Sequence, residues 1–316
     1  MNLHLADNPY DGWYRNPIRG EGPCRYEDLT PFQRMLHGGD WMDVNLCRRH
    51  IHEYISRGHQ IVVAEEGGKV VGECELWLAD EPPPFGRYAD IEMLMVSREC
   101  DRKAVELALV EKGEERARKT GYENYDVSPQ HGGDSLDWEE IGFREIRDTR
   151  MCTADIRDID EPDFDFEMSA AVEDYETTRR LHAWNHREPP QLGFEFSVGL
   201  WPPAKLAGFD RHEKRIFERV SVKTFGIEYF LLALKPDWRE SEVIDVDIWS
   251  AQSALKKREQ AQVIVKSAAA AGSRLGKGIL EVCVPKQLLP AMRELGFKGG
   301  EKRDPWLRKG IVPGQR

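Results

Sequence analysis

Two carboxylates at alternate positions of an apolar run are the residues of this sequence best suited to chemistry. Asp90 and Glu92 lie in the run Asp90-Ile91-Glu92-Met93-Leu94, and side chains two apart on a strand point to the same face of a sheet. Carboxylates held together in a cleft raise one another's pKa and can then accept a proton near neutral pH. The pair is therefore a candidate general base. The alternative is a pair of surface carboxylates whose hydrogen bonds are satisfied and which have no catalytic role.

Positive charges gather shortly after this run. Arg98, Arg102 and Lys103 surround the expected start of a helix at Asp101. Such cations can bind phosphate groups directly. The alternative is a solvated helix start, on which Asp101 caps the backbone N–H groups.

Three further motifs are weighed and set aside. Gly133-Asp134-Ser135-Leu136 spells the signature of a serine hydrolase family, but no downstream Asp-x-x-His follows it, and we interpret it as a helix N-cap. The segment from Gly272 to Lys277 lacks the spacing and the final Ser or Thr of a phosphate loop. His182 and His186 have a spacing that can bind metal, yet no third ligand accompanies them, so no metal is expected.

The elements that must position these residues occur twice, about 155 residues apart. The run Asp90–Leu94 corresponds to the run Asp245–Trp249 in the second half. Both runs are followed by a charged helix and then by a Gly, at Gly121 and Gly276. A strand ending in Pro and a segment closing on Gly-Phe come next in each case. Solenoid repeats are much shorter, roughly 20 to 50 residues. The sequence therefore predicts two domains: residues 1–157 with an N-terminal arm to about Pro31, and residues 158–316.

Hydrophobic periodicity predicts the same order of elements in both repeats. Each has a β-hairpin, a central strand, a long helix, a parallel strand, a short helix and a final strand, which is typical of a mixed α/β sheet. In the first repeat we expect a helix over 41–57, hairpin strands over 61–64 and 70–78, a strand over 88–96, a helix over 101–120 and a last strand over 143–154. In the second we expect hairpin strands over 220–225 and 227–234, a strand over 243–249 and a helix over 256–271, after an acidic linker over 158–165.

The composition of the chain limits the classes of partner that we expect it to bind. The net charge of −11 and the sequence pI near 5.4 argue against nucleic acid, whose binders carry a basic footprint. No apolar run approaches the roughly 20 residues that a membrane span needs. The six cysteines form no CxxC pair, as in reduced thiols of the cytosol. We expect a cytoplasmic protein.

The order of elements and its motifs resemble the GNAT (Gcn5-related N-acetyltransferase) superfamily. The resemblance rests on the hairpin, the strand IEMLMV with its following helix, and the endings WEEIGFRE and MRELGFK. It covers about Arg34 to Asp155 in one repeat and about Glu173 to Lys309 in the other. It implies two tandem domains of the acyl-CoA N-acyltransferase fold.

The resemblance also implies a cosubstrate, acetyl-CoA or another acyl-CoA. In the family its pyrophosphate lies against the backbone at the start of the helix after the central strand. Here Ala104 stands in place of that loop's central Gly, and Glu259 does so in the second repeat. The cofactor-binding residues carried over to this chain are Met95, Val96, Arg98, Asp101, Arg102, Lys103, Ala104 and His131.

The activity implied is transfer of an acyl group to an unidentified amine, which is a small molecule or a peptide. Glu92 would act as the base together with Asp90, in an active first domain supported by a structural, degenerate second domain. The family's tyrosine acid is replaced by Trp138 and, in the second repeat, by Met292, and neither can protonate a thiolate. The alternative is a non-catalytic binding or regulatory protein that has lost acyl-CoA binding.

Overall fold

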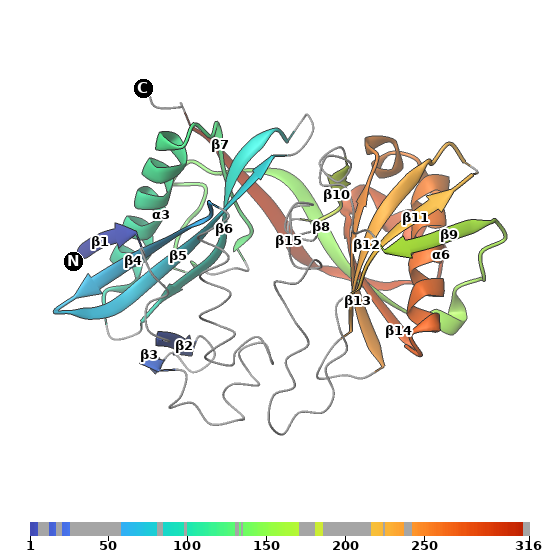
Figure 1. The fold of residues 1–316 in the computed structure, drawn as a ribbon, viewed down its shortest axis with the longest axis horizontal. Helices are drawn as coiled ribbons and strands as arrows, with labels where there is room; N and C mark the ends of the chain where they lie inside the picture. The colour runs from blue at the N-terminus through green and yellow to red at the C-terminus, as the bar shows by residue number, and fades with distance from the viewer. Residues whose placement is uncertain are drawn as a thin grey trace.

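A computed structural model describes residues 1–5, 13–16, 21–25, 58–80, 85–97, 100–129, 133, 135–170, 181–185, 216–223, 225–236 and 242–311. The described parts form two lobes side by side, each a twisted sheet with one long helix against its outer face (Figure 1). Helix α3 (Arg102–Lys119) covers the first lobe and helix α6 (Arg258–Arg274) covers the second. The predicted mixed α/β fold is confirmed.

The described strands of both lobes join in one 13-stranded sheet, and a separate hairpin stands beside it. The first lobe holds β1 (Asn2–Leu5), β4 (Gln60–Glu66), β5 (Lys69–Asp80), β6 (Arg87–Val96) and β7 (Asn124–Val127). The second holds β14 (Ile279–Pro285), β13 (Val243–Ser250), β12 (Tyr229–Pro236), β11 (Ile216–Val222) and β9 (Phe166–Ala170), with β10 (His182–Ala183) against β13. Strands β15 (Lys298–Gly310) and β8 (Arg144–Asp155) lie between the lobes, and β2 (Trp13–Asn16) with β3 (Glu21–Arg25) forms the hairpin.

The last strands of the two repeats are exchanged. Strand β8 ends the first repeat but pairs with β14 of the second lobe, from Thr149↔Pro285 to Asp155↔Ile279. Strand β15 ends the second repeat but pairs with β7 of the first lobe, from Leu307↔Val127 to Gly310↔Asn124. The two exchanged strands also pair with each other, and Figure 1 shows them crossing between the lobes. Strand pairing therefore crosses the predicted boundary between residues 157 and 158.

The hydrophobic core of each lobe contains side chains from the end of the other repeat. Cys152, Ala154 and Ile156, which end the first repeat, pack in the core of the second lobe. Leu307 and Ile311, which end the second repeat, pack in the core of the first lobe. Burial of apolar surface stabilises folds by about 25 cal/mol per Å², so each lobe depends on side chains of the other repeat.

Most predicted elements are found within a few residues of the expected bounds. Both hairpins, both central strands and both long helices are present, because Gly turns and helix caps signal them locally. Asp101 caps α3 by accepting the backbone N–H of Ala104 at 3.2 Å. The helix expected over 41–57 lies outside the described residues.

Three expectations are corrected. Residues 2–5, expected in an arm, form β1 and pair with β4. The short helix expected before Gly142 is a series of turns: the Asp137 carboxylate accepts the N–H groups of Glu139 and Glu140 as a helix N-cap does, but Gly142, at φ 100°, ends the segment after about one turn. The second repeat does form its helix, α7 (Leu289–Glu294). The linker expected over 158–165 begins on a short 3₁₀ helix, η4 (Ile156–Asp158), and buries Ile159 in the second core.

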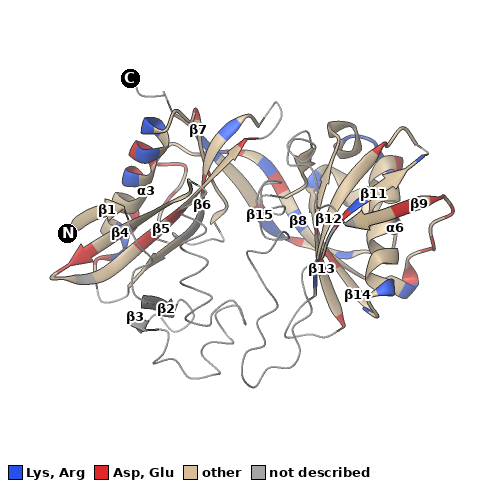
Figure 2. Ribbon diagram, viewed as in Figure 1, with Lys and Arg blue, Asp and Glu red and all other residues tan. Residues whose placement is uncertain are grey.

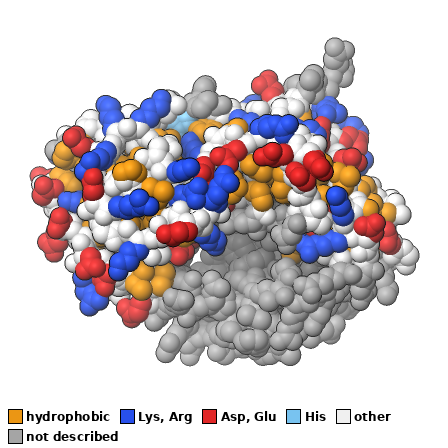
Figure 3. Space-filling view, turned by 180° about the vertical axis from the view of Figure 1, so that it is seen from behind, with side chains coloured by type: hydrophobic (Ala, Val, Ile, Leu, Met, Phe, Trp, Pro, Cys, Tyr) orange, Lys and Arg blue, Asp and Glu red, His pale blue; other side chains and the backbone are white. Residues whose placement is uncertain are grey.

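Charges of both signs are distributed over both lobes (Figure 2). The face seen in Figure 3 interleaves Lys and Arg with Asp and Glu over the described residues, without a broad area of either sign. Within the described ranges no helix is long and apolar enough to cross a membrane.

Candidate functional site

The central strand of the first lobe is irregular at Glu92. In the β5–β6 ladder Leu76 pairs with Ile91 and Glu75 with Met93, so the backbone of Glu92 forms a β-bulge. On the other side, β6 pairs with β7 from Tyr88↔Asn124 only as far as Ile91↔Val127, although β6 continues to Val96. Bulges of this kind redirect side chains and end pairing next to active sites. The predicted base therefore stands at the bulge of β6, one residue beyond its last pair with β7, which ends at Val127.

Glu73 and Glu75 on β5 are functional candidates that the sequence did not reveal. Cys74 and Leu76 pack in the core under α3, so the alternating glutamates face the opposite side of the sheet. Burial raises the pKa of Glu75 to about 7, although a hydrogen bond with Trp77 opposes this shift. Burial, and then the charge of Glu75, raises the pKa of Glu73 well above its ordinary value. A side chain that titrates near neutral pH is suited to general base catalysis.

Asp90 lies on the same face, since it pairs directly with Trp77 across the β5–β6 ladder. We call Glu73, Glu75 and Asp90 the acidic face. Asp90 is fully buried, and burial raises its pKa well above the ordinary value, against the charge of Arg308 and a backbone hydrogen bond from Ile91. Glu75, whose pKa of about 7 lies near neutral pH, is the described carboxylate of this face that we consider best suited to accept a proton.

The start of α3 is less open to an anion than the resemblance implies. The Asp101 carboxylate binds the backbone N–H of Ala104, which a phosphate would otherwise use. The Arg102 guanidinium donates to the buried Glu106 carboxylate at 2.7 Å. Lys103 is exposed, and no hydrogen bond or ion pair joins it to another part of the chain that the structure describes. Of the predicted cations that are described, Lys103 is the one available to a ligand.

The segment after β7 closes on α3 and β6. Ser135 donates its backbone N–H to Glu106 at 3.2 Å, and its hydroxyl donates to the same carboxylate. Gly133 lies against Trp138 and Leu94, where an added Cβ would have no room. Ser135, the serine of the hydrolase-like motif, is thus a hydrogen-bond donor to a buried glutamate. Trp138 is in the core of the first lobe and cannot serve as a proton donor to a thiolate.

The equivalent carboxylates of the second lobe are neutralised. Asp245 and Asp247 occupy the positions of Asp90 and Glu92, but Lys235 lies 3.1 Å from the first and 2.5 Å from the second. Asn185 also donates its side-chain amide to Asp247 at 2.9 Å. In the first lobe the residue opposite Asp90 is Trp77, whereas Asp245 faces Lys235. The two lobes therefore differ in the residue that faces the first acid of this strand, a tryptophan at Asp90 and a lysine at Asp245.

The remaining predicted site residues are placed as follows. Met95 and Val96 end β6, beyond the point where pairing with β7 stops. Arg98 and His131 lie outside the described residues, as does the side chain of Glu92. The described residues contain no group of three His, Cys, Asp or Glu side chains that could hold a metal ion.

Comparisons with known proteins agree with this fold. Residues 26–131 match the model of the acetyltransferase (GNAT) family. A putative acetyltransferase from Pyrococcus horikoshii has a TM-score of 0.57 at 11% identity, over 100% of this chain and 91% of that one. A tandem GNAT protein from the clavulanic acid biosynthesis pathway has a TM-score of 0.54 at 14% identity, over 99% of this chain and 100% of that one.

A third solved structure contains the same fold within a longer chain. The GCN5-related glucosamine N-acetyltransferase region of a fungal multi-domain β-N-acetylglucosaminidase has a TM-score of 0.53 at 16% identity. That comparison covers 97% of this chain but 38% of the fungal one. Identities this low show the fold alone. No curated protein sequence matches this chain.

Proposed function

Because residues 26–131 match the model of the acetyltransferase (GNAT) family, we propose that this chain is an acyl-CoA-dependent N-acyltransferase whose active site is in the first lobe. Acetyl-CoA is the cosubstrate that this family uses, and an amine is the acceptor. The second lobe has a structural role. The contrast across the strand carries this assignment, because Asp245 of the second lobe faces Lys235, which also binds Asp247, whereas Asp90 of the first lobe faces Trp77.

The reaction needs a base and a proton for the leaving group. The acceptor nitrogen attacks the thioester carbonyl carbon, a C–N bond forms and the C–S bond breaks. The ammonium form of the amine must first lose a proton, which Glu92 at the β-bulge or Glu75 on the neighbouring strand accepts. Glu75 suits this role because its pKa of about 7 leaves a large ionised fraction at neutral pH. Since Trp138 cannot donate a proton, the departing thiolate takes one from solvent.

The acidic face also favours a cationic acceptor. Glu73 and Glu75 gain from a nearby positive charge, which would lower their raised pKa values. A polyamine, an aminoglycoside or a lysine side chain has the required charge. The overall negative charge of the chain acts in the same direction.

Calorimetry with acetyl-CoA, followed by an assay of free thiol released with a panel of amines, tests the proposal. We expect Lys103→Glu to weaken acetyl-CoA binding and Lys298→Glu, the same charge change at an exposed position of β15, to leave it unchanged. A ligand present at about 100 times its dissociation constant also stabilises the fold by about 2.7 kcal/mol. Glu75→Gln and Glu92→Gln should each lower kcat more than they change acetyl-CoA affinity. Absence of binding at millimolar acetyl-CoA contradicts the proposal.

A non-catalytic binding protein is the second candidate. The Asp101 cap on Ala104 and the Arg102–Glu106 ion pair favour it, because both occupy groups that would bind the cosubstrate phosphates. On this alternative acetyl-CoA neither binds nor stabilises the protein, and no amine releases thiol. Binding without release of thiol by any amine would instead indicate a protein that senses acyl-CoA.

A further inference from the structure

A buried aspartate of β15 binds groups of both repeats at the junction of the two lobes. One oxygen of the Asp304 carboxyl group accepts the Ser128 hydroxyl at 2.6 Å, and the other accepts the Cys283 thiol at 3.7 Å. The Asp304 carbonyl accepts the Thr149 hydroxyl. All four residues are buried. Asp304 therefore contacts β8, β14 and the residue that follows β7.

The partners of Asp304 occupy corresponding positions of the two repeats. Thr149 and Asp304 are 155 residues apart, which is the separation of the repeats, and they pair with each other across β8 and β15. Asp304 lies 176 residues beyond Ser128 and 21 beyond Cys283, so these two are separated by the same 155 residues. One carboxyl group therefore binds the same position of both repeats, at the place where the repeats meet.

In the first lobe this position adjoins the proposed acyl-transfer site. Pairing of β6 with β7 ends at Val127, and pairing of β13 with β14 ends at Val282. Ser128 and Cys283 are therefore the first residues beyond the last pair of parallel strands in their lobes. Glu92, one of the two proposed bases, takes the same position on β6. A displacement of Ser128 would thus move the chain at the level of Glu92.

Asp304 binds the first lobe more strongly than the second. The distance from the Ser128 hydroxyl is at the short end of the range for O–H···O hydrogen bonds. A thiol is a weak donor, and the Cys283 contact is longer by more than an ångström. The stronger contact is therefore on the side of the proposed acyl-transfer site.

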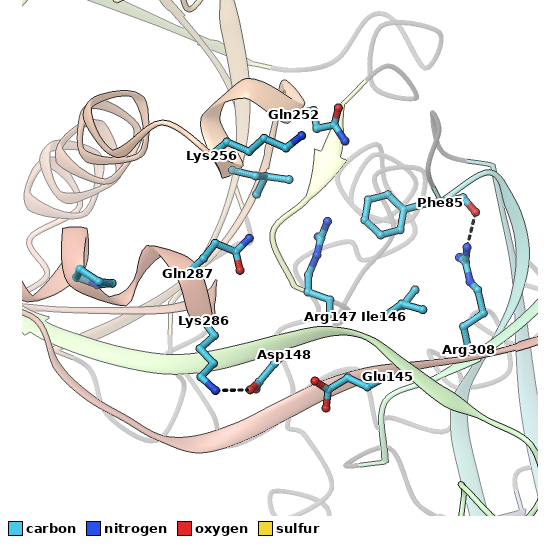
Figure 4. Close-up of a pocket in the computed structure, with 12 residues that line it drawn as sticks. Phe85, Glu145, Ile146, Arg147, Asp148, Gln252, Lys256, Lys286, Gln287 and Arg308 are labelled. Atoms are coloured by element: carbon cyan, nitrogen blue, oxygen red, sulfur yellow. Dashed lines mark hydrogen bonds and ion pairs between the residues drawn. The ribbon is translucent and has the colours of Figure 1, made fainter.

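Ion pairs beside this cluster link the same strands. Arg303, which precedes Asp304, lies 3.5 Å from Asp148, which precedes Thr149. Lys286, just beyond β14, lies 3.6 Å from the same carboxylate. Figure 4 shows the Lys286–Asp148 pair at the edge of a cavity of about 920 Å³ between the lobes. Asp304 thus lies where β8, β14 and β15 are tied together, as a group that positions another must be.

We propose that Asp304 is a positioning residue for acyl transfer, supplied to the first lobe by the second repeat. Its carboxyl group holds the Ser128 hydroxyl and so fixes the end of β7 at the level of Glu92. Misplacement of a reacting group by about 1 Å can cost about a hundredfold in rate. This inference rests on the proposed function, and it gives the second repeat a defined part in that function.

Initial rates of the whole protein with acetyl-CoA and an amine test the role of the bond. We expect Ser128→Ala to lower kcat at least tenfold and to change KM for acetyl-CoA less than threefold. Ser128→Cys, which keeps a weak donor of the kind found in the second lobe, should recover part of the loss. Adding Asp304→Asn to Ser128→Ala should lower kcat less than twofold further, because residues that act as a unit have non-additive effects.

Thr149→Val is the matched control. It removes a buried hydrogen bond to the same residue, but the bond is to the Asp304 backbone carbonyl and not to its carboxyl group. We expect this variant to lose stability and yet to keep kcat within twofold of the wild type. Equal losses of kcat in Ser128→Ala and Thr149→Val would overturn the proposal, because a general loosening of the junction would explain both.

Hydrogen exchange of the whole protein, followed by mass spectrometry, tests the positioning without an acyl donor or an amine. Ser128→Ala and Asp304→Asn should each speed exchange of the backbone amides of residues 124–129 at least tenfold, whereas Thr149→Val should not. Unchanged exchange of this segment in both variants would contradict the proposal. If the wild type transfers no acetyl group, the proposed function is rejected, and exchange still decides whether Asp304 holds the end of β7.

Discussion

Arg308 and Asp126 lie 182 residues apart in the sequence and form a two-point ion pair in the middle of the sheet. The Arg308 Nε lies 2.8 Å from Asp126 Oδ1, and Nη2 lies 2.7 Å from Oδ2. The Trp306 indole N–H donates to Oδ2 as well, at 2.7 Å. Asp126 is fully buried. This cluster fixes the register in which β15 of the second repeat enters the first lobe.

Loss of Arg308 should therefore be costly. Arg308→Met leaves the Asp126 carboxylate buried without its cation, and removal of one partner of a buried pair costs about 3–5 kcal/mol. Urea unfolding at neutral pH measures the loss. Asp126→Asn in the same chain should recover part of it, because the orphaned charge is gone.

Arg303→Met is the matched control on the same strand. Arg303 is half exposed and pairs with Glu145 and Asp148, and exposed ion pairs are worth at most about 1 kcal/mol. Equal losses in the Arg303 and Arg308 variants would show that burial of the Asp126 pair does not matter.

The raised pKa of Glu75 predicts a pH dependence of stability. Its ordinary value is 4.5 and its value in the fold is about 7. Between these values the folded chain holds a proton that the unfolded chain releases, so stability falls as pH rises from 4.5 to 7 and then levels off. Over this pH range, Glu75 alone should lower the free energy of unfolding by roughly 3 kcal/mol. Chemical unfolding across this range should show a shallower fall in Glu75→Gln than in the wild type.

Glu66→Gln provides the comparison for that experiment. Glu66 is exposed at the turn of the same hairpin, so its replacement should leave the pH profile of the wild type intact. If the profiles of the wild type and Glu75→Gln coincide, Glu75 does not titrate as described.

Lys235 should be essential to the second lobe. Lys235→Met leaves Asp245 and Asp247 side by side without their shared cation, and we expect a loss of about 3–5 kcal/mol at pH 7. The loss should shrink toward pH 5, because one carboxylate then takes up a proton. Urea unfolding at the two pH values tests this, and Lys235→Met with Asp247→Asn should recover stability at pH 7. A loss independent of pH would point to packing instead of charge.

Replacing Gly113 of α3 by alanine should lower stability, which is the opposite of the usual effect at a glycine inside a helix. Alanine stabilises a helix interior by about 1 kcal/mol relative to glycine, but a Cβ at Gly113 would collide with the Tyr125 hydroxyl. That hydroxyl donates to the Val110 carbonyl at 3.2 Å, so it cannot move without losing the bond. We expect Gly113→Ala to cost about 1–3 kcal/mol in thermal or urea unfolding.

Gly272→Ala in α6 is the companion variant. Its Cβ would first meet the end of the Ile156 side chain at 2.9 Å, which a change of rotamer can relieve. The loss should be smaller than at Gly113, and Gly113→Ala with Tyr125→Phe should be less destabilised than Gly113→Ala. A stabilising Gly113→Ala would contradict the described contact.

Local signals in the sequence predict the elements but not which strands pair. The Gly67-Gly68 turn and the Asp101 cap can be recognised from a few neighbouring residues of the sequence, so the hairpin and α3 could be predicted. The choice between β8 and β15 depends on contacts between distant residues, such as the Ser128 hydroxyl with Asp304 at 2.6 Å. Similar strands end both repeats, so the hydrophobic pattern fits either arrangement.

The candidate site was predicted only in part for a related reason. Asp90 and Glu92 stand out because they are acids at alternate positions of a short apolar run. Glu73 and Glu75 alternate with Cys74 and Leu76, a pattern that also fits a strand with one face in water. Their raised pKa values come from burial of that second face, which is a property of tertiary structure that the strand itself does not encode.

The exchanged strands also delay completion of the first lobe while the chain is being synthesised. The first lobe lacks β15 until translation has passed Trp306, which lies 180 residues beyond its partner Asp126. At about 5–20 residues per second, that interval is on the order of ten to forty seconds. During it, the edge of β7 and the carboxylate of Asp126 have no strand to cover them, and unpaired edges invite association with other chains. We therefore expect the nascent first repeat to be open to such association until β15 has been added.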